Sequence, residues 1–235
     1  MGERNWTDEL EAFLRERFAK SCATARQPVP FSGLRFNPPL GFEESKYFLL
    51  GLEAGLFEVD DDGNIRTELL PAGGEESRVC PVFRNQPPPP RFLRETICQL
   101  STASSLILKR GWLRSHVQIE SSLEEHRSLA AGADLVIRSS AGDLLISAKV
   151  KRSVAEMEKL ITDLQTCFHR GVHAQDDCGF PQNHPTYEFC AHYRPPYFWG
   201  VAPDADVCFR MKYEGNAIEM EQLRALPSRS MLEFN

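Results

Sequence analysis

The stretch Gly132–Arg152, GADLVIRSSAGDLLISAKVKR, places an acid and a base where they can meet. Two apolar runs joined by a tight turn predict a β-hairpin. Asp134 begins the first strand and Lys149 ends the second, so the hairpin brings them to the same end, and Ser147 shares a face with Lys149. A carboxylate and an ammonium group are costly to gather in a partly buried place unless they satisfy one another or an ion. This hairpin is therefore the first candidate for a chemical site.

The elements that must position this hairpin follow from the spacing of apolar residues. The predicted elements are helices at 91–110 and 153–168, a strand from His116, the hairpin strands at 133–138 and 144–150, and later strands from Tyr197, Asp206 and Ala217. Ser153 is a plausible cap for the second helix, with Glu156 three residues on. The order is α-β-β-β-α-β, which predicts an α/β fold with a mixed central sheet flanked by the two helices.

This order, with these residues at these places, resembles the PD-(D/E)XK nuclease superfamily over about residues 91–168. Glu95 matches the family's helix glutamate, Ala133-Asp134 stands in place of Pro-Asp, and Ser147-Ala148-Lys149 stands in place of (D/E)-x-K. The resemblance implies a restriction-endonuclease-like fold and metal-dependent hydrolysis of phosphodiester bonds in DNA or RNA. It implies Mg²⁺ or Mn²⁺ as the cofactor, with Asp134 as a metal ligand and Lys149 beside the attacking water.

Ser147 is the departure from this pattern, because a hydroxyl is a poor substitute for a carboxylate in binding a hard cation. One repair is a carboxylate from elsewhere: Glu120, which shares a strand face with His116 and Gln118, or Glu95 on the helix. The expected site is then Asp134, Lys149, Glu95, Glu120 and Ser147, with Asp134, Glu120 and Glu95 as the metal ligands. One alternative is a catalytically inactive relative that serves as a nucleic-acid-binding or protein-assembly module, and another is a small globular protein whose hairpin only mimics the signature.

Basic residues are expected to gather near this site, at the end of the first helix and at the end of the second hairpin strand, where they could contact a phosphate backbone. They are Lys109, Arg110, Arg114, Lys151 and Arg152. The chain as a whole carries a formal net charge of -6, so a nucleic-acid partner must be bound by a local patch rather than by the overall field.

A second group of chemical residues lies in a Cys/His-rich insertion at 167–192. Cys178, His184, Cys190 and His192 could supply the four ligands of a zinc ion, although the spacing matches no familiar zinc motif. Buried, unligated cysteines in a loop-rich insertion are the alternative interpretation.

Composition indicates the class of protein and its expected location. The 235 residues are 42% hydrophobic and 26% charged, an ordinary globular balance. No apolar run suits a membrane span, the N-terminus lacks a signal-peptide pattern, and the seven cysteines do not form a disulfide scaffold. We therefore expect a cytoplasmic protein (or a nuclear one in a eukaryote) with no membrane partner. The expected organisation is an N-terminal extension at 1–84 with a helix near residues 6–22, a Pro-rich connector at 85–90 and the core at 91–235.

Overall fold

The computed structural model describes residues 4–30, 33–69, 81–84, 91–119, 132–215 and 217–233 of the chain. The helices are α1 (Trp6–Thr24), α2 (Phe42–Glu53), α3 (Arg94–Leu108), α5 (Val154–Arg170), α6 (His184–Tyr193) and α7 (Arg229–Glu233), with short 3₁₀ turns at Arg114–His116 and Gln175–Asp177. The small strands are β1 (Phe57–Val59), β2 (Ile65–Thr67), β3 (Phe83–Arg84) and β4 (Arg91–Phe92).

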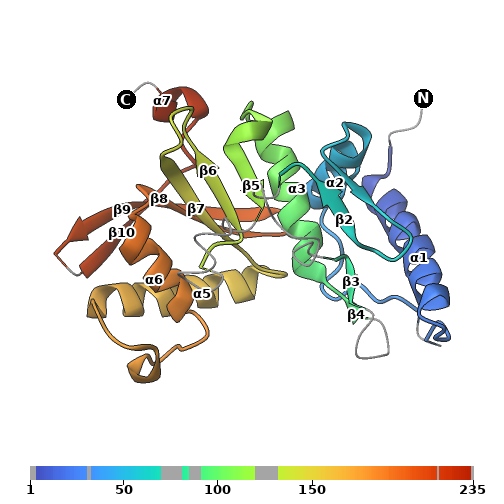
Figure 1. Ribbon diagram of the computed structural model, residues 1–235, viewed down its shortest axis with the longest axis horizontal. Coiled ribbons are helices and arrows are strands. Elements are labelled where there is room, and N and C mark those ends of the chain that lie inside the picture. The colour runs from blue at the N-terminus through green and yellow to red at the C-terminus, as the bar shows by residue number, and fades with distance from the viewer. Residues whose placement is uncertain are drawn as a thin grey trace.

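One six-stranded mixed sheet organises the fold (Figure 1). Its strands are β5 (Val117–Ile119), β6 (Leu135–Arg138), β7 (Leu144–Val150), β8 (Tyr197–Ala202), β9 (Ala205–Glu214) and β10 (Ala217–Leu223), in the spatial order β10-β9-β8-β7-β6-β5. Only the β7–β8 pair is parallel, and α5 lies in the connection between these strands. The expected mixed α/β fold, with the β6–β7 hairpin inside the sheet, is confirmed.

The alternation of side chains along β7 assigns the two faces of the sheet. Ile146 and Ala148 point to the core that contains α3, whereas Ser147 lies between Val136 of β6 and Phe198 of β8, on the face covered by α5 and α6. Helices therefore cover both faces, which explains why β6 and β7 are almost continuously apolar.

The two helices expected to flank the hairpin are present with small changes at their ends. α3 begins three residues later than predicted, at Arg94. α5 is capped by the Ser153 hydroxyl, which accepts a hydrogen bond from the Glu156 amide at 3.3 Å. The first core strand is shorter than predicted, because His116 belongs to a 3₁₀ turn and Glu120 lies outside the described residues. The insertion at 167–192 also contains a full helix, α6, where a loop was expected.

The N-terminal region shares one core with the sheet. Leu10 and Phe48 belong to the same buried cluster as Ile146 and Trp199. In Figure 1, α2 lies against α3 and α1 lies beyond α2. Residues 85–90, the expected connector, lie outside the described residues, but β3 and β4 on either side of them pair with each other.

A buried ion pair joins this region to α3. The guanidinium of Arg94 binds both carboxylate oxygens of Glu44, and both side chains are almost fully buried. Burial raises the pKa of the Glu44 carboxyl, and the positive charge of Arg94 opposes that shift. Removing either partner would leave the other as an uncompensated buried charge, so the contact fixes α2 on α3.

Candidate functional site

Asp134 and Lys149 meet at the end of the central hairpin. Pairing of Leu135 with Ala148 sets Asp134 opposite Lys149, and the Lys149 Nζ lies 2.5 Å from the Asp134 Oδ1. The other carboxylate oxygen accepts a hydrogen bond from the Val150 amide at 2.7 Å. The side chain of Asp134 is 25% exposed and that of Lys149 is 12% exposed. These two contacts thus fix the orientation of the Asp134 carboxylate at a partly exposed position.

A pocket of about 560 Å³ opens beside Asp134, between the hairpin end and the N-terminus of α3. Glu95, in the first turn of α3, lines the same pocket, as does Gln99. The Gln99 amide nitrogen donates to the Asp134 backbone oxygen at 2.6 Å, which ties α3 to the hairpin. The structure therefore brings Asp134, Glu95 and, through its contact with Asp134, Lys149 to one place. Sequence reasoning missed Gln99, which carries no motif of its own.

A smaller pocket of about 220 Å³ continues from the first one along α5. The two pockets share Glu95 and Glu156, so together they form a groove from Asp134 toward Asn183, just before α6. We call this the Asp134 groove.

Acids and bases alternate along the Asp134 groove in close pairs. The pairs are Asp134–Lys149 at 2.5 Å, Glu95–Lys151 at 3.5 Å, Glu156–Arg152 at 2.6 Å and Asp163–Lys159 at 2.6 Å. Lys151 and Arg152 are thus at the site, as expected from the sequence. A metal ion or a phosphate entering the groove would exchange partners with these pairs rather than meet bare charges.

Ser147 lies close to this site in sequence but does not line the groove. Its side chain is completely buried, and its hydroxyl has no hydrogen-bond partner among the described residues apart from a contact with the Cys190 thiol of α6. Burial raises the pKa of that thiol to about 12. The position at which the sequence resemblance leads us to expect a carboxylate is therefore buried in the core.

The other basic residues lie at the opposite end of α3, about 21 Å from Glu95 for a helix of this length. Lys109 pairs with Glu43 at 2.7 Å, Arg110 approaches Asp206 at 3.4 Å, and Arg114 donates to a backbone oxygen. Lys109, Arg110 and Arg114 are therefore not part of the Asp134 groove.

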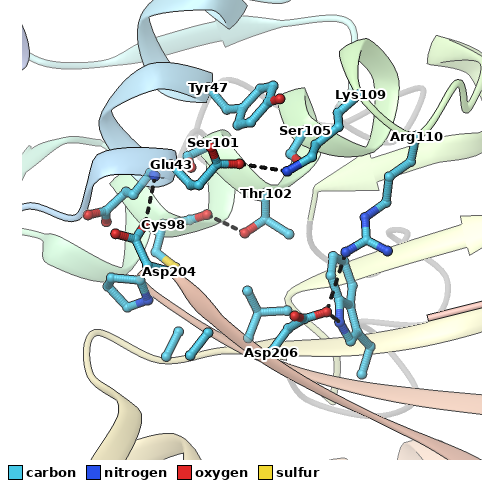
Figure 2. Close-up of a pocket in the computed structure, with 16 residues that line it drawn as sticks. Glu43, Tyr47, Cys98, Ser101, Thr102, Ser105, Lys109, Arg110, Asp204 and Asp206 are labelled. Carbon is cyan, nitrogen blue, oxygen red and sulfur yellow. Dashed lines mark hydrogen bonds and ion pairs between the residues drawn. The ribbon is translucent and has the colours of Figure 1, made fainter. Parts of the chain in front are cut away.

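Lys109 and Arg110 line a separate pocket, whose volume is about 200 Å³. Its lining residues are drawn in Figure 2. Four acidic side chains line it as well, namely Glu43, Glu44, Asp204 and Asp206. Two bases among four acids give this pocket a negative balance, which does not favour a phosphate ligand.

The Cys/His-rich insertion brings together a different set from the one expected. Cys167, His173 and Cys178 offer ligand atoms that all lie within 4.8 Å of one another, so they could hold a metal ion. Of the four predicted zinc ligands, only Cys178 belongs to this group. His184 lies outside it, Cys190 is buried against Ser147, and His192 is exposed on α6. The signal in the sequence was the regular spacing C-x5-H-x4-C-x5-H from Cys167 to His184.

Comparisons with known proteins identify no relative. No protein-family model matches the chain, no curated protein is significantly similar to it, and no solved structure matches its fold. The helices, as far as the described residues go, lack an apolar stretch of the length that a membrane crossing requires.

Proposed function

We propose that this chain is a metal-dependent nuclease with a restriction-endonuclease-like core, and that the Asp134 groove is its active site. The observation that carries the proposal is the Asp134–Lys149 pair at the end of the central hairpin, beside a pocket that Glu95 shares. The element order supports it, because α3, the antiparallel strands β5–β6–β7, α5 and the parallel strand β8 follow one another in the chain.

The donor set of the pocket fits a hard divalent cation such as Mg²⁺ or Mn²⁺. Asp134 comes from a strand end and Glu95 from a helix, so two carboxylates reach the pocket from different elements. Each oxygen of Asp134 accepts one hydrogen bond and keeps a lone pair, and the Glu95 side chain is 52% exposed. A bound divalent ion would polarise a phosphoryl oxygen and lower the pKa of the attacking water.

The protein's own side chains would do the rest by position and charge. Asp134 would orient Lys149, whose ammonium group stabilises negative charge developing on the phosphate. Lys151 and Arg152 would contact phosphates of the nucleic-acid backbone, which positions the substrate without reading its sequence. Ser147 would have no direct part, because it is buried away from the groove.

A cleavage assay on single- and double-stranded DNA and RNA, with Mg²⁺ or Mn²⁺, tests the proposal. Asp134→Asn should abolish cleavage while it keeps an acceptor for the Val150 amide, and Lys149→Ala should cost about 10²–10³-fold in rate. Asp143→Asn is the matched control, because Asp143 is an exposed acid on the same hairpin and does not line the groove. If the wild type cleaves and the Asp134→Asn variant cleaves at the same rate, this assignment of the active site is excluded.

A catalytically inactive binding module is the second candidate, and the burial of Ser147 specifically favours it. The missing carboxylate cannot be regained at that position without disturbing the core, and every acid of the groove already has a basic partner. This candidate predicts no cleavage by the wild type, and nucleic-acid binding that needs no divalent ion and is unaffected by Asp134→Asn.

A further inference from the structure

Three segments of the Cys/His-rich insertion bring metal-binding side chains close together. Cys167 lies in the last turn of α5, Cys178 directly follows the 3₁₀ turn at Gln175–Asp177, and His173 lies in the loop between them. The Sγ atoms of Cys167 and Cys178 are 3.2 Å apart. His184, the first residue of α6, adds a second ring, with its centroid 4.9 Å from that of His173.

Two imidazole nitrogens at this point are buried and lack a hydrogen-bond partner among the described residues. They are the Nε2 of His173 and the Nδ1 of His184. His184 is only 1% exposed, so its ring is well inside the protein. The other ring nitrogen of His173, Nδ1, lies 2.6 Å from the Gly171 backbone oxygen. That contact favours the tautomer with a proton on Nδ1, which leaves a lone pair on Nε2, the arrangement common for a metal-bound histidine.

We propose that Cys167, His173, Cys178 and His184 form a structural zinc site. Two thiolates and two imidazoles are a familiar donor set for tetrahedral zinc, and Zn–S bonds of ~2.3 Å would place the two sulfurs about 3.8 Å apart. The observed separation of 3.2 Å needs only a small opening. His184 lies outside the group of three whose ligand atoms are all within 4.8 Å of one another, so its ring would have to move closer when the metal binds. The proposal is independent of the nuclease function, because none of these residues lines the Asp134 groove.

Few side chains of the insertion are buried, and this explains why the segment would need a metal to become ordered. Between Val172 and Asn183 the only buried side chain is that of Cys178, which is 7% exposed, and Val172 itself is 73% exposed. Such a segment has little apolar surface to offset the conformational entropy that it loses on ordering. A zinc ion would supply that free energy directly, because binding to a site absent from the unfolded chain stabilises the folded one.

Metal content of the purified full-length chain is the first test. Protein purified without chelators and measured by mass spectrometry of the elements should contain about one zinc per chain. Cys178→Ser and His184→Gln should each lower that content at least tenfold, while His184→Cys, which restores a ligand, should keep it. His192→Gln is the matched control, because His192 lies on the same helix and is exposed.

A cobalt spectrum of the wild type keeps the test decisive even if the variants fail to fold. Zinc would be removed with a chelator and Co²⁺ added alone. The expected result is the intense visible absorption of tetrahedral cobalt together with a thiolate-to-cobalt charge-transfer band. An octahedral spectrum without that band would overturn the proposal, as would zinc content that Cys178→Ser leaves unchanged. A Cys167–Cys178 disulfide in protein purified under reducing conditions would also overturn it.

Discussion

Substitutions of Ser147 test whether this position belongs to the core or to a metal site. The PD-(D/E)XK pattern would place a carboxylate here, and from the sequence alone Ser147→Glu is expected to be tolerated or to strengthen metal binding. The structure reverses that expectation. Ser147 is fully buried between Val136 and Phe198 and beside Cys190, so the added carboxylate would enter an apolar layer.

The destabilisation expected for Ser147→Glu has one part from packing and one from charge. Extra side-chain volume in a well-packed core costs about 1–3 kcal/mol, and Ser147→Gln, which matches glutamate in shape, would show this part alone. A glutamate forced to stay neutral at pH 7 costs about 3.7 kcal/mol more, from a reference pKa near 4.3. That cost is a ceiling, because a carboxylate that stays charged is stabilised instead by attraction to Lys149, about 6.6 Å along the strand, by about 2.5 kcal/mol at an effective dielectric constant of ~20. Since Asp134 already neutralises Lys149, the real attraction is smaller.

We therefore expect Ser147→Glu to be less stable than Ser147→Gln by about 1–4 kcal/mol at pH 7. Burial raises the pKa of the new carboxyl in the folded state. Above the unfolded-state pKa, the unfolded chain therefore binds fewer protons than the folded protein, and the stability of Ser147→Glu falls as pH rises. The difference between the two variants should thus shrink at pH 5, where neutralising a glutamate costs only about 1 kcal/mol. Ser147→Ala should be neutral or slightly stabilising, because it removes a buried hydroxyl that is poorly satisfied.

Urea unfolding followed by circular dichroism at pH 5 and pH 7 measures these differences. The reasoning fails if Ser147→Glu is as stable as Ser147→Gln at pH 7. It also fails if Mg²⁺ stabilises Ser147→Glu and not Ser147→Gln, because that result would place residue 147 in the metal pocket.

Two further predictions concern contacts that fix the fold. Asp204, in the β8–β9 turn, accepts hydrogen bonds from two amides in the first turn of α2, at 2.7 and 3.1 Å. Asp204→Ala should therefore lower the free energy of unfolding, measured in urea, by about 1–2 kcal/mol. An unchanged free energy of unfolding would mean that this helix cap is not formed in solution. A Cβ on Gly132 would lie 2.2 Å from the Phe189 Cβ, so Gly132→Ala should cost about 1–3 kcal/mol by pushing α6 off the sheet. Gly179→Ala is its control, because a Cβ there meets nothing within 4 Å, and equal melting temperatures for the two variants would contradict this account.

The hairpin and its ion pair could be predicted because they depend on local rules. Alternation and a two-strand register carry Asp134 and Lys149 to the same end, whatever the rest of the chain does. The flanking helices could be predicted from their apolar periodicity and from the Ser153 cap. These features need no knowledge of distant segments.

The environment of Ser147 could not be predicted, because it depends on a helix some 40 residues further along the chain. The sequence pattern of the insertion favours a loop where α6 lies, although Pro185 near the start of α6 is a recognised N-terminal helix signal. A sequence reading without α6 gives no reason to expect that Ser147 is buried. It also allows Cys190 to be predicted as a zinc ligand. Asp204 is a similar case, since it caps a helix 160 residues earlier in the chain.

The pairing of β3 with β4 bears on how this chain could be divided. In the backbone register Phe83 pairs with Phe92 and Arg84 pairs with Arg91, so the backbone is paired on both sides of residues 85–90. A single cut in that segment would separate the chain into pieces of unequal length that still share the α2–α3 contact and the Arg94–Glu44 pair. Neither piece contains a complete hydrophobic core, because Leu10 and Phe48 belong to the same buried cluster as Ile146 and Trp199. The two pieces are thus suited to a split protein that reassembles when both are present, and neither is suited to expression alone.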